Sequence, residues 1–441
     1  MLKRMGGTVV NTPEVRIADA AFPAPFYAGL EFNPPVRGPW NIVNTAMLLP
    51  EAHQIYVCAE GCLRGVVLTA AEMKAADRMS WVAMEESDLI GGNLERQILE
   101  GVTDILNKMG HLPRAVLIYI SCAQLFAGCD FLGVLPKLRE RFPGVDFVDC
   151  YMNPTMRKSG LTPDELTRRQ IYAPLRKTEL DGRFVNFIGN DNPTDESSEL
   201  CVLLRNAGFG IRDLTRCKTY DEYLQMASSA YNLTCLPAAR AAGGALERRL
   251  GQRQLYLPLC YGKEEILRNY DTLASDLEIS LPDFTPLAER ANRALADALT
   301  VVDDTPVEID YTAVPRPLGL ARLLTECGFR VRRVYADGFT GEEQADFRWL
   351  QSHTPELRIC ATVNPELRFR AARGPETVLA VGQKAAYFSG TRRFVNIVSG
   401  GGMYGFDGIA RLAERIRDAF LHEKDTRALI SRKGLGCESC L

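Results

Sequence analysis

The sequence predicts an α/β fold with three Rossmann-like domains, each a mainly parallel sheet flanked by helices. Strand-length apolar runs are followed repeatedly by short turns and then by segments with helical periodicity. The run over 115–120 is uniformly apolar, as expected of a parallel strand that is buried on both faces. This alternation of strand and helix favours parallel sheets with helices on their faces.

The first predicted domain spans 46–180 and follows an extended N-terminal arm over 1–45, which is rich in Pro and Gly. Its predicted elements are helices near 66–73, 93–109 and 134–142 and strands near 81–84, 115–120 and 145–150. Thr162, Pro163 and Glu165 form a capping box with Pro at the first helical position, so another helix is expected to start there.

Two further predicted domains span 181–302 and 303–425, and they show the same order of elements. The second has strands at 184–188 and 231–235, with helices at 196–207, 238–250 and 264–277. The third has strands at 307–311, 329–335, 378–382 and 394–398, with helices at 318–327 and 409–421. A C-terminal tail over 426–441 contains the motif Cys437-x-x-Cys440, which is either a redox or metal motif or an unused tail.

Length and charge narrow the class of protein. The 441 residues suffice for two or three domains, and the formal net charge of −3 argues against a nucleic-acid binder. No apolar run approaches the roughly 20 residues that a membrane span requires. The basic N-terminus has no apolar signal core behind it, so a cytoplasmic location is expected.

The number and spacing of the cysteines indicate a metal site. There are thirteen cysteines but only four histidines, and no two histidines have metal-ligand spacing. Cys58 and Cys62 lie four residues apart, and Cys122 and Cys129 lie seven apart directly after the strand at 115–120. Thiols at the end of a parallel strand lie where α/β proteins place their chemistry, so we expect an iron–sulfur site. The alternative is that these cysteines are core filler, as most lone cysteines are.

Two other features have alternative interpretations. The glycine-rich turn over 400–408 could bind a phosphate through backbone N–H groups, but it lacks the Gly-Lys-Ser/Thr of a P-loop. A structural turn, or a wall for a large cofactor, is favoured. A set of basic side chains could bind an anion, although a solvated face is the commoner explanation: Arg157, Lys158, Arg168 and Arg169.

Several short motifs occur in a recognisable order along the chain. They are Gly91-Gly92-Asn93-Leu94, Ser121-Cys122-Ala123, Leu233-Thr234-Cys235 and Tyr404-Gly405-Phe406-Asp407-Gly408. In their order and spacing the chain resembles the nitrogenase component 1 superfamily over roughly 28–420. That superfamily includes nitrogenase catalytic subunits, cofactor-assembly scaffolds and the catalytic components of related reductases.

The resemblance implies an iron–sulfur cluster, either 4Fe-4S or larger and P-cluster-like, held between two subunits. Cys122 matches one family ligand, and either Cys58 or Cys62 matches another. The family's earlier cysteine has no counterpart near 27–32, so the other of Cys58 and Cys62, or Cys129, is expected to replace it. The partner subunit would be an identical or a homologous chain.

The resemblance also bears on a second cofactor. Cys235 falls where nitrogenase catalytic subunits anchor their large cofactor, whereas Tyr404 stands where the partnering histidine would be expected. Because a tyrosine is a poor ligand for a low-valent metal cluster, a true nitrogen-fixing subunit is not expected. Three roles stay open for Cys235: ligand of a second metal cofactor, wall of a substrate cavity, or buried thiol.

The function implied is that of a catalytic-component subunit of a nitrogenase-like reductase. An ATP-dependent iron protein would pass electrons through the inter-subunit cluster to reduce a small molecule or a bound cofactor. The alternative is a non-catalytic scaffold on which a metal cofactor is assembled. The sequence identifies no catalytic acid or base, and neither a nucleic-acid nor a membrane partner is expected.

Overall fold

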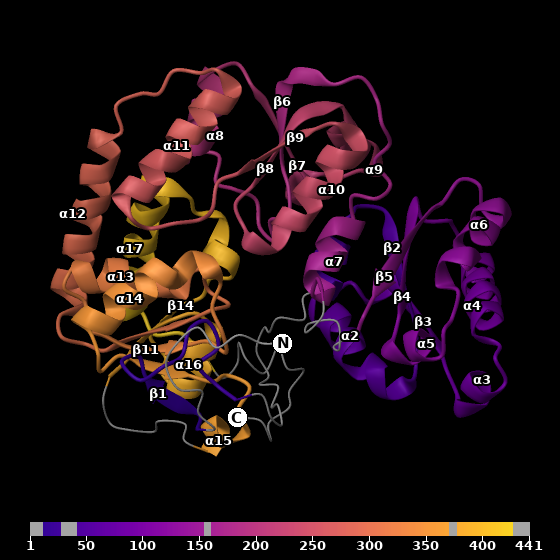
Figure 1. Ribbon diagram of the computed structural model, residues 1–441, viewed down its shortest axis with the longest axis horizontal. Helices are drawn as coiled ribbons and strands as arrows, with labels where there is room; N and C mark the ends of the chain where they lie inside the picture. Colours follow the sequence, from indigo (N-terminus) through magenta and orange to yellow (C-terminus); the bar gives the residue numbers. More distant parts are fainter. Residues whose placement is uncertain (1–11, 28–41, 154–159, 370–376, 427–441) are drawn as a thin grey trace. The chain divides into compact units, whose positions relative to one another are not determined.

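The computed structural model describes residues 12–27, 42–153, 160–369 and 377–426. These form two compact units (Figure 1). Unit 1 comprises 1–38, 194–207 and 257–441, and unit 2 comprises 39–193 and 208–256. The described residues form three sheets, two in unit 2 and one in unit 1, and the predicted α/β class is confirmed. The division into three domains at 180 and 302 stays a prediction.

The first sheet of unit 2 has the strand order β3-β2-β4-β5, and all its pairs are parallel. One face packs on α1 and α2 and the other on α4 and α6, because alternate strand residues point to opposite faces. The elements are α1 (Ile42–Met47), β2 (Ala52–Cys58), α2 (Glu60–Glu72), β3 (Met79–Ala83), α3 (Glu86–Ile90), α4 (Leu94–Lys108), β4 (Ala115–Ile120), α5 (Cys122–Phe126), α6 (Phe131–Arg141), β5 (Asp146–Tyr151) and α7 (Pro163–Gln170).

The second sheet of unit 2 has the order β7-β6-β8-β9 and is also fully parallel. Its elements are β6 (Asp181–Phe187), β7 (Gly210–Asp213), α9 (Tyr220–Leu224), β8 (Ser229–Thr234), α10 (Arg240–Leu250) and β9 (Arg253–Tyr256). Helix α10 ends at Gly251, whose positive φ of 79° makes it a left-handed cap of the kind that favours glycine.

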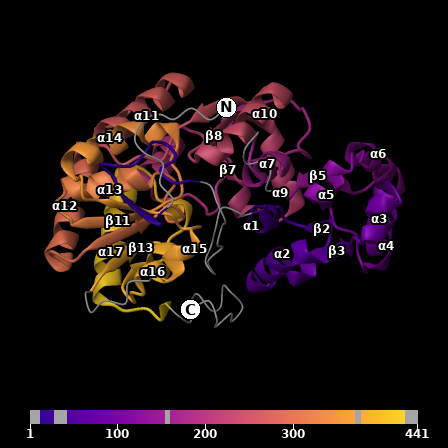
Figure 2. The same ribbon diagram turned by 60° about the horizontal axis from the view of Figure 1, so that its bottom comes forward.

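The sheet of unit 1 has the order β1-β12-β11-β10-β13-β14 and is parallel except at β1. Its strands β1, β11 and β14 are labelled in Figure 1, and β11 and β13 are labelled in Figure 2. Its strands are β1 (Glu14–Arg16), β10 (Val307–Asp310), β11 (Val331–Tyr335), β12 (Arg358–Cys360), β13 (Leu379–Val381) and β14 (Phe394–Val395). The helices of unit 1 are α8 (Glu199–Asn206), α11 (Lys263–Leu277), α12 (Thr285–Val302), α13 (Pro317–Glu326), α14 (Gln344–His353), α15 (Pro365–Phe369), α16 (Gln383–Ser389) and α17 (Gly405–Leu421). The long helices α12 and α17 pack along each other.

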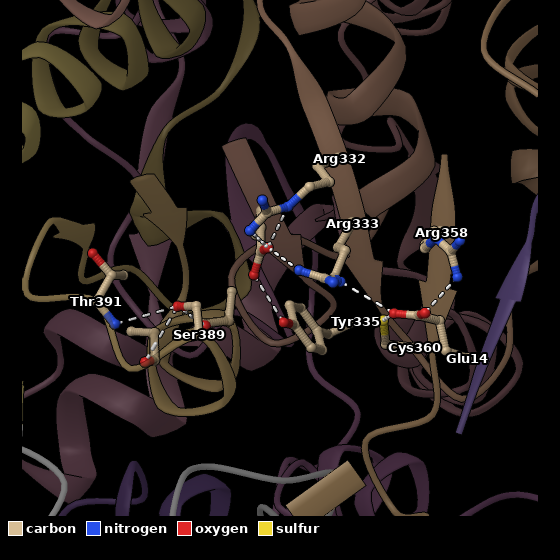
Figure 3. A network of polar contacts seen from close by, with 11 residues as sticks. Glu14, Arg332, Arg333, Tyr335, Arg358, Cys360, Ser389 and Thr391 are labelled. Carbon is tan, nitrogen blue, oxygen red and sulfur yellow. Dashed lines mark hydrogen bonds and ion pairs between the residues drawn. The ribbon is translucent and has the colours of Figure 1, made fainter. Parts of the chain in front are cut away.

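The predicted arm contributes the antiparallel edge strand β1. The carboxylate of Glu14 accepts hydrogen bonds from Arg358 Nη1 at 2.6 Å and from Arg333 Nε at 3.1 Å (Figure 3). Arg333 also contacts the fully buried Glu308, which accepts a hydrogen bond from the Tyr335 hydroxyl at 2.8 Å. These ion pairs and hydrogen bonds hold β1 against β12, and β1 covers the edge of β12 that would otherwise be unpaired.

All three sheets repeat one connection pattern. In each sheet of unit 2, the first strand has its two sequence successors on opposite sides. In the sheet of unit 1, β11 and β12 lie on one side of β10, and β13 and β14 lie on the other. The chain therefore reverses its direction of travel across each sheet at that strand. These switch points lie between β2 and β4, between β6 and β8, and between β10 and β13. Ligands of open α/β sheets bind outside the carboxyl ends of the strands at such points. No helix in the described ranges is long and apolar enough to cross a bilayer.

Candidate functional site

Two of the predicted thiols lie at the carboxyl ends of the strands that flank the first switch point. Cys58 is the last residue of β2 and is buried, and Cys122 follows β4 as the first residue of α5 and is half-buried. Cys62 is exposed in the first turn of α2. Cys62 and Cys122 thus belong to helices, and the three thiols lie where strands pass into helices.

Neighbouring thiols in this group affect one another's pKa. The pKa of Cys58 is raised to about 12, mainly by burial and in smaller part by the neighbouring Cys62. Burial also raises the pKa of Cys62, with Cys122 adding to the effect. The three thiols therefore form a coupled group in unit 2. Among the described residues, no three His, Cys, Asp or Glu side chains are arranged so that they could hold a metal ion.

Gln124 connects the segment that contains Cys122 to the segment that contains Cys58. Its buried side chain accepts from the Ser121 amide at 2.9 Å and donates from Nε2 to the carbonyl of Val57 at 2.6 Å. One amide side chain thus closes the capping box of α5 and binds the end of β2 next to Cys58. The position of Cys122 relative to Cys58 depends on this contact.

We expect Gln124→Ala to lower the free energy of unfolding by about 1–3 kcal/mol, because it strands a buried carbonyl and a buried amide. Denaturant titration of the purified chain measures this. Gln225→Ala, at an exposed position in the same unit, serves as the control and should stay within about 0.5 kcal/mol. Equal stability of both variants would show that the Gln124 bridge does not hold the segment.

Cys129 has different neighbours. Burial raises its pKa to about 12, and the charges acting on it are those of Glu95 and Asp130. The Glu95 carboxylate accepts from the Asp130 amide at 2.6 Å, which holds Glu95 against this turn. Cys129 thus pairs with a carboxylate of α4, and its role as a cluster ligand stays a prediction.

Cys235 lies at the switch point of the second sheet. It follows β8 directly and is buried. Across the switch point, β6 is followed by Gly189, whose φ is +77°, and a Cβ there would lie 2.2 Å from the Cβ of Ala239. Only glycine fits such a position, so the backbone passes close to the start of the helical segment after Cys235.

Tyr404 lies in unit 1, and whether it faces Cys235 stays a prediction. It is buried at the N-cap of α17, and its hydroxyl accepts from Asn269 Nδ2 at 3.0 Å. The same amide nitrogen lies 3.4 Å from the sulfur of Cys260. Tyr404 and Cys260 line one small cavity with mostly apolar walls. Cys260 was not predicted, since an isolated buried cysteine carries no distinguishing pattern.

The glycine-rich turn at the start of α17 already holds an anion from its own chain. The carboxylate of Glu199 accepts hydrogen bonds from the amides of Phe406 and Asp407, the latter at 2.8 Å. A Cβ on Gly405, which has a φ of +65°, would collide with that carboxylate. The structure favours the structural interpretation of this turn, because Glu199 occupies the place that a phosphate would need.

Of the four basic residues that could bind an anion, Arg168 is already paired within the protein. Arg168 is buried, and it pairs with Asp164 at 2.9 Å and with Asp191 at 2.8 Å. It is neither on a solvated face nor available to a ligand, so the solvated-face interpretation is wrong for this residue. Arg157 and Lys158 lie outside the described residues.

The switch point of the third sheet carries a buried charged group that sequence reasoning missed. Asp310 ends β10, and Lys384 lies in the first turn of α16, just after β13. Both are fully buried. Burial lowers the pKa of Lys384, while Asp337 and Asp310 oppose that shift. Among the described residues, its ammonium has no hydrogen-bond partner. The one sequence signal for Lys384 was its place shortly after a predicted strand, and many surface lysines have the same place.

The two carboxylates beside Lys384 are already occupied by other donors. Asp310 accepts from the Thr312 amide at 2.8 Å and from the Ala385 amide at 2.8 Å. Asp337 accepts from the hydroxyl of Thr362 at 2.5 Å. The ammonium therefore retains donor capacity at the edge of the sheet where a ligand would bind.

The fold and the thiols together define an α/β protein with a candidate redox-metal site. The family model described as "Nitrogenase component 1 type Oxidoreductase" matches residues 43–421, and the chain belongs to this family. The solved structure "Nitrogenase Cp1 at pH 6.5" is similar over 90% of this chain and 94% of its own, at a TM-score of 0.68 and 14% identity. "Nitrogenase Cp1 at pH 5" covers 88% and 91%, at a TM-score of 0.54 and 11% identity. No curated protein matches the chain.

Proposed function

We propose that the chain is a catalytic-component subunit of a nitrogenase-like reductase. It would receive electrons from an ATP-dependent iron protein through an iron–sulfur cluster shared with a second subunit. The observation that carries the proposal is the coupled thiol group, Cys58, Cys62 and Cys122, at the switch point of the first sheet. Membership of an oxidoreductase family supports the same reaction class.

The thiol group has the donor type that an iron–sulfur cluster needs, and cluster binding would have to draw the three side chains together, since they are not arranged around a metal ion in the described residues. Cysteine thiolates are the usual ligands of such clusters, and a bound cluster would supply one-electron transfer. Because burial keeps the Cys58 thiol protonated in the metal-free chain, cluster binding would release protons, and affinity would rise with pH. The group has three thiols, one of which is exposed. The remaining ligands of a cluster would come from Cys129 or from a partner subunit.

Exposed apolar side chains near the same part of the sheet support a docked partner. Helix α3 contributes no residue to the core, and its last residue, Ile90, is 87% exposed. Phe126, at the end of the helix that Cys122 begins, is 77% exposed. Apolar residues left open in this way commonly mark interaction sites. The partner would be a second component 1 subunit or the iron protein.

The ligand to be reduced would bind at the carboxyl edge of the unit 1 sheet. Lys384 offers a buried donor without a hydrogen-bond partner in the described structure, which suits a carbonyl or carboxylate oxygen. Asp310 and Asp337 hold the ammonium in place and compensate its charge. Lys384 would orient the ligand through this donor.

Variants of the three thiols test the proposal. After anaerobic purification, iron and sulfide content and the EPR spectrum are measured for Cys58→Ala, Cys62→Ala and Cys122→Ala, with Cys327→Ala in unit 1 as the matched control. We expect each thiol variant to lose iron and change the spectrum, while the control keeps both. Full iron content and an unchanged spectrum in all three would refute the ligand assignment.

The exposed helix α3 gives a separate prediction. We expect Ile90→Asp to weaken association with the partner by about ten-fold or more, because it places a charge at an apolar contact. Sedimentation velocity of the chain alone, and titration with the iron protein, measure the two associations. Leu421→Asp changes an exposed apolar residue of unit 1 in the same way and should change neither. Unaltered association of both variants would exclude α3 from the interface.

A scaffold for cofactor assembly is the second candidate, and the environment of Tyr404 favours it. A tyrosine hydroxyl that accepts from Asn269 offers a neutral oxygen, which suits temporary holding of a metal cofactor better than permanent ligation. Turnover of a small substrate with iron protein and ATP would support the reductase. Transfer of a cofactor to an apo-protein without turnover would support the scaffold.

A further inference from the structure

A row of easily oxidised side chains crosses the first sheet of unit 2. Tyr56 of β2 is paired in register with Trp81 of β3 and with Tyr119 of β4. Tyr119 is in turn paired with Cys150 of β5. Residues paired in a parallel sheet point to the same face, so an indole, two phenols and a thiol follow one another across four strands. The next row on this face reads Met79, Gln54, Leu117 and Val148.

The two phenols are in direct contact. The rings of Tyr56 and Tyr119 lie 4.5 Å apart between centroids, and their planes differ by 7°. Both side chains are fully buried, and Cys150 is buried beside them. The Tyr56 hydroxyl donates to Gln54 Oε1 at 2.7 Å, and the Tyr119 hydroxyl donates to the Ile42 carbonyl at 3.3 Å. A stacked pair held in this way is rigid and excludes water.

The row connects the cysteine site with solvent. Cys58 lies on the same strand face as Tyr56, two residues further along β2, which is a step of about 7 Å. Trp81 is on the other side of Tyr56, about 4.8 Å away in backbone spacing, and is 50% exposed on the edge strand. Each step is therefore short, and the last side chain reaches water.

We propose that Tyr56, stacked on Tyr119, and Trp81 form a radical relay that carries oxidising equivalents from the cysteine site to the surface. The proposal rests on the proposed function in one respect, since an iron–sulfur site is a place where dioxygen-derived radicals would arise. The relay would spare the thiolates irreversible oxidation by moving the damage to a side chain that soluble reductants can reach.

The electron balance is simple. A one-electron oxidant of the radical type takes a hydrogen atom from the Cys58 thiol, Tyr56 returns one electron to the sulfur, and water returns the proton. The Tyr56 proton shifts within its hydrogen bond to Gln54 and returns when Trp81 supplies the next electron. The oxidised indole of Trp81 loses its N–H proton to water. A soluble thiol or ascorbate then restores Trp81 with one electron and one proton, so the radical oxidant and the soluble reductant are the only species consumed.

The relay is tested in the metal-free full-length chain, so that its failure is distinguishable from failure of the cluster proposal. A ruthenium polypyridyl is attached to the exposed Cys62, in a background in which Cys122, Cys437 and Cys440 are serine. Flash-quench oxidation then creates a hole beside Cys58, and transient absorption and EPR identify the radical that forms. We expect an indole radical in the parent chain and its replacement by a phenoxyl radical in Trp81→Phe.

Two variants complete the test. Tyr56→Phe keeps the ring stack but removes the oxidisable phenol, so the indole radical should form more slowly or be lost. Trp349→Phe, in unit 1, is the control and should leave the indole radical unchanged. The same radical in the parent, Trp81→Phe and Tyr56→Phe chains would overturn the relay, and the row would then be core packing only.

Peptide mass spectrometry after exposure of the metal-free chain to a one-electron radical oxidant gives a second measurement. Oxidation should accumulate on Trp81 in the parent chain and shift to Cys58 in Trp81→Phe. Equal oxidation of Cys58 in both chains would also contradict the relay.

Discussion

Replacing Arg168 by methionine should lower the free energy of unfolding by about 3–5 kcal/mol. The guanidinium is buried, pairs with Asp164 and Asp191, and donates to the Gly189 carbonyl at 2.5 Å. Its removal leaves two carboxylates without their counter-charge in a low-dielectric interior, and that penalty exceeds the loss of the pairs alone. Chemical denaturation followed by circular dichroism measures the change.

Arg176→Met is the matched control. Arg176 also pairs with an aspartate, Asp146, at 2.9 Å, but its side chain is 84% exposed. Exposed pairs contribute little, so this variant should stay within about 0.5 kcal/mol of the parent. Similar stability losses in the two variants would mean that burial of the Arg168 cluster does not set its contribution.

Unit 2 should lose stability in mild acid because of His53. This side chain is 7% exposed on β2, and its ring contacts the Ser80 hydroxyl at 2.9 Å. Burial lowers its pKa to about 4, with the charge of Arg78 adding to the effect. Since the folded state binds the proton more weakly than the unfolded state does, stability falls as pH drops from about 6.5 to about 4. We expect a loss of about 2 kcal/mol after allowance for partial solvent screening.

His53→Gln removes the titrating group while keeping a polar contact to Ser80. Its free energy of unfolding, measured by denaturant titration at several pH values, should vary less between pH 6.5 and 4 than that of the parent. The exposed His111→Gln should keep the parent's acid dependence. If the free energy of unfolding of His53→Gln fell between pH 6.5 and 4 as much as that of the parent, the loss of stability in acid would be assigned to other groups.

The parts of the fold that were predictable are those with strong local patterns. The strand at 115–120 is uniformly apolar, and the predicted bounds match β4. Strand β2 was not predicted, because His53 and Gln54 interrupt its apolar character although both are buried. These two polar residues are accommodated by Ser80 and by the Val43 carbonyl, and such long-range partners are invisible in a single segment.

The candidate site was predictable only in part, for the same reason. The cysteines could be located from spacing and from the family resemblance, and three of them are coupled in the structure. Glu199, by contrast, lies 207 residues before the amide of Phe406 that it binds. Lys384 resembles an ordinary surface lysine until the sheet order places it beside Asp310. Residues whose role depends on tertiary contact carry no local signal.

The central claim is that the thiol group at the first switch point holds an iron–sulfur cluster. Anaerobic purification of the native chain, followed by iron and acid-labile sulfide analysis and by EPR of the dithionite-reduced protein, tests it most directly. The account predicts a coloured protein with matching iron and sulfide and a reducible cluster signal that Cys122→Ala lacks. A colourless, iron-free chain, which stays so after reconstitution with iron and sulfide, would contradict it.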